Sequence, residues 1–365
     1  MAKKNYLVTH RTPVAKPAFP AIDAHNHLWG NWQVDKVVKT MDEVGVLSYC
    51  DVTGNVMIEF AGGGYRIKPG DINGFIDNCS SKYPGRFYCF TMSAFAHPAD
   101  TPLFSDHKRF VDECISTLNE HVEKGARGLK VLKELGLHYR DSSGNLISCN
   151  DDRLAPIWEE AERLGIPVLI HQADPAGFFE PVTPDNEHYE SLIKFPSWSF
   201  ADPKYPRKID LLKRRDDLVR KHPGTKFILP HFGNYAENIQ YVSDLLDDCP
   251  NAYIDFSARL DELGRQPYST REFFIKHQDR IIFGTDMPAN IDSSVEMYRT
   301  YFRFLETFDE SFYSPDYDGT FERARWPICG IGLPREVLKK IYHENIIKII
   351  PSLGTVNNFT QNKSL

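Results

Sequence analysis

The sequence predicts an α/β protein built as a (β/α)8 TIM-like barrel, on three observations. Apolar runs of strand length recur along the chain, and their number, eight, is the number of strands that a closed parallel barrel needs. Helical periodicity fills the segments between the runs. The runs are apolar almost throughout, which is typical of parallel strands covered on both faces. The predicted strands are 21–27, 46–53, 87–95, 128–132, 168–172, 227–231, 252–257 and 281–285.

Predicted helices separate these strands and follow the last one. Residues that cap helix N-termini precede two of them, Ser105 or Asp106 in one case and Asp151 or Asp152 in the other. An open doubly wound sheet is the alternative, but no Gly-x-Gly-x-x-Gly motif follows the first strand. The predicted helices are 33–44, 71–81, 107–124, 153–164, 208–221, 236–248, 269–277, 293–306 and 334–349.

We expect one domain over residues 1–365, with its core at about 20–350. Barrels of this type commonly run to roughly 250 residues and more with insertions. A long loop insertion at 174–207, after the fifth strand, and a second segment at 309–333 are rich in proline and aromatic residues. Long loops in compact domains are often lids or binding loops. A packed surface extension or a subunit contact is the alternative.

Charge and cysteine content narrow the class of partner. The net charge of −7 offers no electrostatic reason for a nucleic acid or an anionic membrane as partner. No apolar run approaches the roughly 20 residues of a membrane helix, and the basic N-terminus lacks the apolar core of a signal peptide. The seven cysteines are scattered and form no Cys-x-x-Cys pair, which argues against a disulfide scaffold or a thiolate zinc site. We expect a cytoplasmic protein with a small-molecule substrate, and a homo-oligomer is a reasonable expectation.

The first predicted strand ends on the motif His25-Asn26-His27. Residues two apart in a strand point to the same side, so the two imidazoles are expected to lie together. In a barrel this strand end lies at the C-terminal mouth, where active sites of barrel enzymes form. Imidazole is a common ligand of zinc and similar divalent ions. The pair by itself is a weak signal, because histidine pairs arise often by chance.

Later strands end on residues of the same chemistry. The fifth strand ends on His171, the sixth on His231 and the eighth on Asp286. A single histidine or aspartate at a strand end usually caps the strand or satisfies a hydrogen bond. Four strand ends with metal-ligand chemistry are harder to explain in that way, and together they predict a metal site.

This pattern resembles that of the amidohydrolase superfamily. Within it, the chain is similar to the amidohydrolase-related subgroup that includes aminocarboxymuconate semialdehyde decarboxylase. The resemblance extends over about residues 20–350. Further matching segments are Pro84-Gly85-Arg86-Phe87, Gly125-Ala126-Arg127-Gly128-Leu129-Lys130, Gly284-Thr285-Asp286-Met287-Pro288 and Ile341-Tyr342-His343-Glu344-Asn345.

The resemblance implies one divalent metal ion held by four residues, namely His25, His27, His171 and Asp286. Zinc suits this donor set best, with manganese or iron as alternatives. The resemblance also implies that Asp286 and His231 are catalytic: Asp286 accepts the proton of a metal-bound water and passes it on, and His231 stabilises an oxyanion or moves a proton. Lys130 lies where some relatives carry a metal-bridging carboxylated lysine, but this subgroup resembles a mononuclear one. We expect Lys130 to contact a substrate carboxylate, with charge pairing inside the barrel as the alternative.

Other residues are weaker candidates. Arg259, after the seventh strand, can clamp a substrate carboxylate or form a structural salt bridge. Trp29 either lines the pocket or packs against the core. Asp174 is expected either to support His171 or to form a loop turn, and His97 is expected on a surface loop.

These residues predict a metal-dependent hydrolase of a small polar substrate such as a lactone, amide or ester. The alternative is non-oxidative decarboxylation of an unsaturated or aromatic carboxylic acid, because the subgroup includes such enzymes and uses the same residues for it. A catalytically inactive barrel that serves as a binding protein is a third hypothesis. Its signature would be the loss of a ligand, whereas all five residues of the pattern are present.

Overall fold

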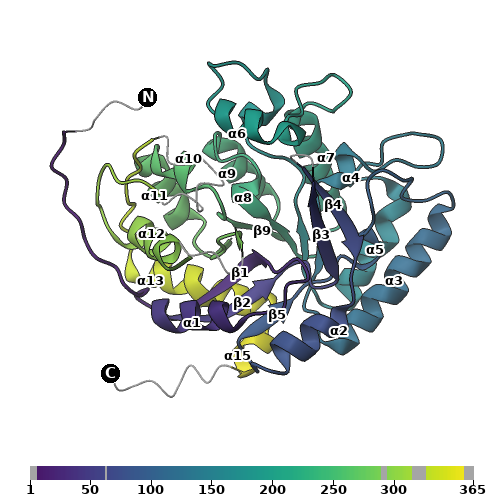
Figure 1. The fold of residues 1–365 in the computed structure, drawn as a ribbon, viewed down its shortest axis with the longest axis horizontal. Helices are drawn as coiled ribbons and strands as arrows, with labels where there is room; N and C mark the ends of the chain where they lie inside the picture. Colours follow the sequence, from purple (N-terminus) through teal and green to yellow (C-terminus); the bar gives the residue numbers. More distant parts are fainter. Residues whose placement is uncertain (1–5, 62–63, 289–293, 315–325, 357–365) are drawn as a thin grey trace.

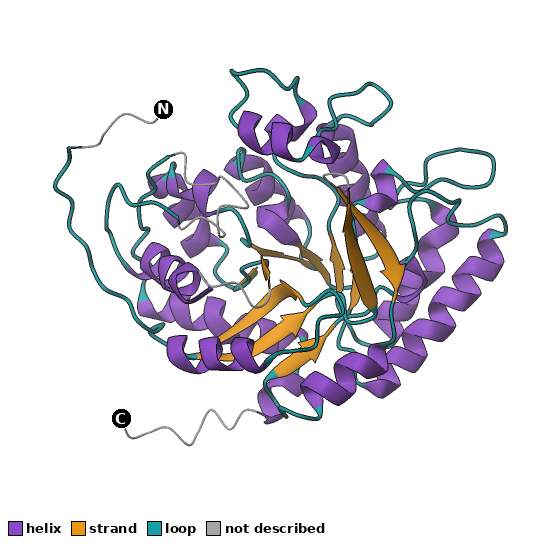
Figure 2. Cartoon of the chain, in the orientation of Figure 1, coloured by secondary structure: helices purple, strands orange, loops and turns teal. Residues whose placement is uncertain are grey.

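The computed structural model describes residues 6–61, 64–288, 294–314 and 326–356. Short parallel strands lie at its centre and helices surround them (Figures 1 and 2). Eight strands follow one another around the centre in chain order. They are β1 (Ala21–His27), β2 (Val46–Asp51), β5 (Phe87–Cys89), β6 (Leu129–Val131), β7 (Val168–Ile170), β8 (Phe227–Leu229), β9 (Ala252–Asp255) and β10 (Ile281–Ile282).

The strands form two parallel sheets that backbone hydrogen bonds join at both seams. One sheet has the order β11 (Met287–Pro288), β1, β2, β5, and the other has the order β10, β9, β8, β7, β6. At the first seam, the amide of Lys130 donates to the carbonyl of Thr91 at 2.7 Å. At the second, the amide of Ala24 donates to the carbonyl of Phe283 at 3.0 Å. This arrangement confirms the predicted TIM-like barrel.

Helices cover the outside of the strands. In α3, the side chain of Asp106 accepts hydrogen bonds from the amides of Lys108 and Arg109, which fixes the start of the helix. The main outer elements are α1 (Asp35–Val44), α2 (Ile72–Phe75), η1 (Ile76–Ser80), α3 (His107–Lys124), α5 (Ala155–Arg163), α7 (Lys208–Lys221), α9 (Ile239–Asp248), α11 (Pro267–Lys276) and α12 (Ser294–Glu306). The final predicted helix is divided into α13 (Arg335–Lys339), a π-helical turn η6 (Lys340–Glu344) and α14 (Asn345–Ile349), followed by α15 (Ser352–Val356).

A buried apolar cluster fills the inside of the barrel. It takes Ile22 and Ala24 from β1, Cys50 from β2, Leu169 from β7, Ile228 from β8 and Ile282 from β10, and α14 contributes further isoleucines. On β6 the residue paired with Leu169 is Lys130, which is fully buried. A charged side chain therefore stands where the neighbouring strands place apolar ones.

Several predicted strands end earlier than expected because the chain turns sharply at the mouth of the barrel. After β8, His231 and Phe232 have left-handed backbone with φ of 56° each, inside the turn α8 (Pro230–Gly233). After β5, the chain enters the 3-10 turn η2 (Ser93–Phe95). The functional residues at these positions therefore lie on turns that follow the strands.

The sequence patterns did not predict the antiparallel hairpin of β3 (Val56–Ala61) and β4 (Gly64–Pro69) that follows β2. Tyr65 of this hairpin donates a hydrogen bond to Oε1 of Glu134 at 2.7 Å, next to the C-terminal end of β6. The hairpin therefore packs on the mouth of the barrel.

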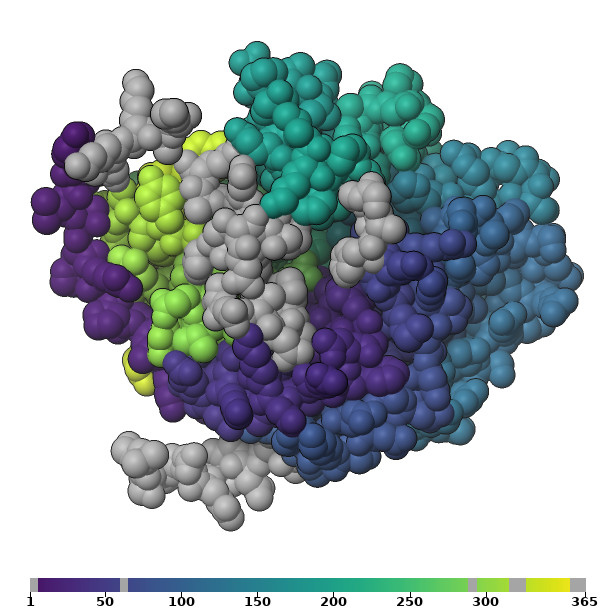
Figure 3. Space-filling view, in the orientation of Figure 1, coloured from purple at the N-terminus to yellow at the C-terminus, as the bar shows by residue number. Residues whose placement is uncertain are grey.

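The insertion at 174–207 is folded and packed, and it forms the teal lobe at the top of Figure 3. It contains η4 (Ala176–Phe179), α6 (Tyr189–Lys194) and η5 (Pro196–Trp198). Its own apolar cluster includes Phe178, Leu192 and Phe200, which pack against Leu211 and Leu212 of α7. In the 309–333 segment, Phe312 and Ile328 form an antiparallel bridge, while 315–325 lies outside the described residues. No helix in the described part of the chain is long and apolar enough to cross a membrane.

Candidate functional site

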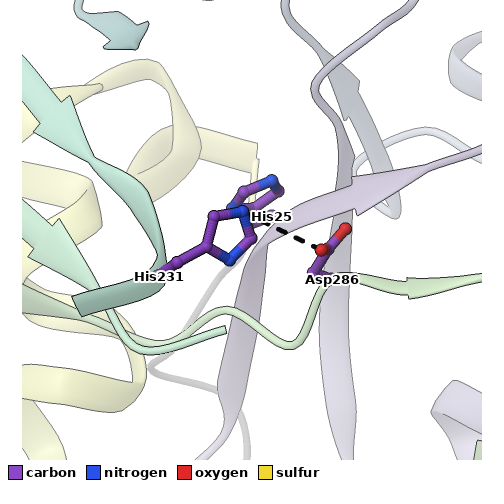
Figure 4. Close-up of side chains that lie close together, drawn as sticks. All are labelled: His25, His231 and Asp286. Atoms are coloured by element: carbon purple, nitrogen blue, oxygen red, sulfur yellow. Dashed lines mark ion pairs between the residues drawn. The ribbon is translucent and has the colours of Figure 1, made fainter. Parts of the chain in front are cut away.

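Three residues at the mouth of the barrel form a group that can hold a metal ion. They are His25 at the end of β1, His231 on the turn after β8, and Asp286 between β10 and β11. One ligand atom from each lies within 4.8 Å of the others. Figure 4 shows the two imidazoles and the carboxylate facing a common point, with the ion pair of His231 and Asp286 dashed.

His27 adjoins this group. Its Nε2 lies 3.3 Å from Oδ1 of Asp286, and Nε2 of His231 lies 3.9 Å from Oδ2 of the same carboxylate. Each oxygen of Asp286 therefore faces one histidine. Trp29 stacks on His27 with ring centroids 4.0 Å apart and an interplanar angle of 1°, so its indole supports the imidazole.

Hydrogen bonds behind the histidines orient their rings. Nδ1 of His25 lies 2.8 Å from Oδ2 of Asp255, and Nδ1 of His27 lies 3.0 Å from Oγ of Thr53. Nδ1 of His231 lies 2.9 Å from the carbonyl of Ser257. When Nδ1 is held in this way, Nε2 is left to bind a metal, and this is the usual arrangement around metal-binding histidines. The donor set and its supporting hydrogen bonds therefore fit a divalent ion.

Asp255 is a residue of this site that sequence reasoning missed. Besides the ring of His25, its carboxylate accepts hydrogen bonds from the amide of His231 at 3.0 Å and from the hydroxyl of Ser257 at 2.6 Å. One side chain at the end of β9 thus connects two members of the group. A signal was present, because the predicted seventh strand carries this carboxylate two residues before its end.

Electrostatics keep the site in the protonation state that a metal needs. Burial lowers the pKa of His27 to about 3 and, together with the charge of His171, lowers that of His231 well below its usual value. Burial alone raises the pKa of Asp286, but the hydrogen bond from His27 and the neighbouring histidines outweigh it and bring the pKa well below the usual range. Neutral imidazoles and an ionised carboxylate are the forms that coordinate metal ions.

Lys130 lies directly beside the group. Its Nζ is 3.3 Å from Nε2 of His25, and its side chain is fully buried. Burial lowers the pKa of this ammonium to about 8. Among the described residues, His25 is its one hydrogen-bond partner, and no carboxylate forms an ion pair with it. An ammonium buried in this way has capacity for an anionic ligand.

His171 lies next to the group but faces another partner. Its ring centroid is 4.6 Å from that of His231, while its Nε2 lies 3.2 Å from Oδ1 of Asp174. The second oxygen of Asp174 pairs with Lys133. Asp174 thus supports His171, which is the first of the two roles expected for it. The assignment of His171 as a metal ligand stays a prediction.

Arg259 follows β9 and is buried at 7 % exposure. Its guanidinium donates to the carbonyl of Ala258 at 2.6 Å, and within the described part of the chain it forms no salt bridge. Of the two interpretations of Arg259, the structural salt bridge is not formed among the described residues, and the contact with a substrate carboxylate stays a prediction. His97 lies apart from the histidine group, half-buried, with Nδ1 at 2.7 Å from the carbonyl of Pro98.

Comparison with known proteins assigns the class. A model of the amidohydrolase family matches residues 22–351, which is most of the chain. The protein therefore belongs to the amidohydrolase family.

Individual relatives include several decarboxylases. The chain is 26% identical over 167 residues to a gamma-resorcylate decarboxylase of Rhodococcus jostii, a match that covers 40% of this chain and 47% of that protein, or about half its length. Among solved structures, it is similar to 2,6-dihydroxybenzoate decarboxylase from Rhizobium (TM-score 0.53, 15% identity, 92% and 99% of the two chains). It is also similar to a dihydroxybenzoic acid decarboxylase from a Polaromonas species, solved with manganese and 2-nitroresorcinol (TM-score 0.52, 15% identity, 91% and 97%). At these identities the structures establish a common fold.

The support that Asp255 offers His25 can be tested by replacing the carboxylate with an amide. In Asp255→Asn we expect the affinity for Mn²⁺ or Zn²⁺ to fall by about 10- to 100-fold, because an uncharged partner orients and polarises His25 less strongly. Titration of metal-free protein against a chelator of known affinity measures the change. Asp247→Asn, at a solvent-exposed ion pair with Lys276, is the matched control. Equal affinities in both variants would contradict the role of Asp255.

Proposed function

We propose that this protein is a metal-dependent decarboxylase of a small aromatic or unsaturated carboxylic acid. Its family membership supports an enzyme, and its sequence similarity to a gamma-resorcylate decarboxylase supports this reaction over hydrolysis. The sequence alone favoured a hydrolase, with decarboxylation as the alternative. The similarity to a decarboxylase supports decarboxylation as the first candidate and leaves hydrolysis second.

The observation that carries the proposal is the buried cation beside the histidine group. Lys130 has no carboxylate partner among the described residues and lies 3.3 Å from Nε2 of His25. A buried charge is costly unless it is paired, and a substrate carboxylate would provide the missing partner. Arg259, buried and also without a salt bridge in the described residues, is a second cation for an anionic substrate.

The metal site in this proposal combines the sequence prediction with the geometry. His25, His27 and Asp286 would hold the ion, with His231 and His171 as the candidates for a further ligand. A bound divalent ion supplies positive charge that stabilises negative charge developing on the substrate. A site of histidines and one carboxylate suits zinc or manganese.

For this reaction the protein must bind the anionic substrate and supply a proton. The substrate carboxylate leaves as CO2, the electron pair of the broken bond stays on the ring or alkene carbon, and that carbon takes up a proton. Lys130 and Arg259 would bind and orient the anionic substrate. Asp286 and His231, whose side chains face each other at 3.9 Å and are unprotonated at rest, would relay that proton from water to the carbon.

Hydrolysis remains the second candidate because of one observation. The carboxylate of Asp286 is kept ionised by its histidine neighbours and lies in the group that can hold a metal ion, which is where an acceptor for the proton of a metal-bound water would be needed. That is the role expected of it in a hydrolase, where water must be activated to attack a carbonyl carbon.

Isotope labelling separates the two reactions. The metal-loaded protein is incubated with a panel of hydroxybenzoates, unsaturated acids, lactones and amides, once in D2O and once in H2(18)O. Decarboxylation places one deuterium on the carbon that lost CO2 and no ¹⁸O in the remaining product. Hydrolysis places one ¹⁸O in the product and no carbon-bound deuterium. We expect the first pattern by mass spectrometry, and the second pattern alone would overturn the proposal.

The substrate role of Lys130 is tested by Lys130→Met, which keeps the length of the side chain and removes its charge. We expect kcat/KM for a carboxylate substrate to fall roughly 30-fold or more, which corresponds to about 2 kcal/mol for the loss of a buried charged partner. Steady-state kinetics measure the effect. Lys276→Met, at a solvent-exposed lysine, serves as the control. An unchanged kcat/KM in Lys130→Met would show that the ammonium does not bind the substrate.

A further inference from the structure

The backbone around Asp286 is held by β1 at three successive amides. The amide of Thr285 donates to Oδ1 of Asp23 at 3.0 Å. The amide of Asp286 donates to the carbonyl of His25 at 2.7 Å. The amide of Met287 donates to Oδ1 of Asn26 at 3.0 Å. Two of the three acceptors are side chains, so this seam depends on which residues β1 carries.

The hydroxyl of Thr285 adds to the same seam. Its Oγ lies 2.6 Å from Oδ2 of Asp23 and 3.0 Å from Oδ1 of Asn26, so it can donate its proton to either acceptor. Helix α12 reaches the seam from outside, since the hydroxyl of Tyr298 donates to Oδ2 of Asp23 at 2.8 Å. All three side chains, Asp23, Asn26 and Thr285, are fully buried.

An irregularity in β1 accompanies this arrangement. Asp23 pairs with Tyr49 and Asn26 pairs with Asp51, so three steps along β1 match two steps along β2. Such a bulge changes the direction of side chains locally, and bulges are frequent next to active sites. Here it lies between Asp23 and Asn26, the two residues whose side chains accept hydrogen bonds from the amides of 285 and 287.

These hydrogen bonds surround the backbone of Asp286, which is left-handed with φ of 53°. A residue with a Cβ rarely adopts this conformation unless its surroundings enforce it. Here the hydrogen bonds donated by the amides of residues 285, 286 and 287 hold the backbone in this conformation. Without them the backbone would relax toward the extended region, and the carboxylate would turn away from Nε2 of His27 and Nε2 of His231, which it now faces at 3.3 and 3.9 Å.

We propose that Asp23, Asn26 and Thr285 are positioning residues that lock Asp286 in its left-handed conformation and thereby aim its carboxylate at the metal site. This inference rests on the proposed role of Asp286 as a metal ligand. It assigns a task to three buried polar residues that are not among the predicted metal ligands.

Paired variants at Thr285 test the proposal. Thr285→Val keeps the shape of the side chain and removes the hydroxyl, whereas Thr285→Ser keeps the hydroxyl. We expect the affinity of metal-free Thr285→Val for Mn²⁺, titrated against a chelator, to fall about 10-fold or more, and Thr285→Ser to recover most of this loss. Asn26→Ala, which removes the acceptor for the amide of Met287, should weaken Mn²⁺ binding by a similar factor. Thr300→Val, a threonine on the surface of α12, is the control.

Two further readouts separate positioning from stability and from the proposed reaction. If the residues were only structural, Thr285→Val and Asn26→Ala would lower the melting temperature while the folded proteins bound Mn²⁺ as tightly as the wild type, and this would overturn the inference. In active protein, we expect kcat to fall in both variants with KM unchanged. Weakened Mn²⁺ binding in a protein that decarboxylates no panel substrate would support the inference while contradicting the proposed function.

Discussion

The hydrogen bonds between β1 and residues 283–287 are the constraint on which the rest of the structure depends. The amide of Ala24 bonds to the carbonyl of Phe283, and the amide of Asp286 bonds to the carbonyl of His25. The same seam therefore joins the last strand of the barrel to the first and brings the carboxylate of Asp286 to the histidines of β1. The same contacts therefore close the barrel and assemble the site, because the end of the eighth strand must meet the end of the first.

The buried charges around the site are arranged so that a cation and an anion can bind there. Histidines kept neutral by burial surround an ionised carboxylate, and Lys130 occupies an interior position of β6 that is apolar on the neighbouring strands. Such a group of charges costs free energy in an empty protein and is offset when opposite charges enter. A cation bound by Asp286 and an anion bound by Lys130 would balance one another. This balance of charge is the physical reason for proposing a metal ion and an anionic substrate together.

Much of this could be predicted from the sequence, and the failures have physical causes. Strands and helices were predictable from their apolar periodicity, and the residues that end strands one, six and eight did meet. Three features escaped prediction. The hairpin at 56–69 lacks the long apolar run that marked the barrel strands. Asp255 ends a strand as Asp286 does, but only the fold shows that it lies behind His25. His231 was predicted at the site, but the left-handed turn that carries it was not, because no pattern of apolar residues encodes such a turn.

The central claim is that one divalent ion binds where β1, β8 and the seam at Asp286 meet. A crystal structure of the protein grown with Mn²⁺, with anomalous diffraction recorded at the manganese edge, tests it most directly. The account predicts a single strong anomalous peak within coordination distance of His25 and Asp286, with a further histidine completing the protein ligands. A fully ordered site without a peak at saturating Mn²⁺, or a peak bound by other residues, would contradict it.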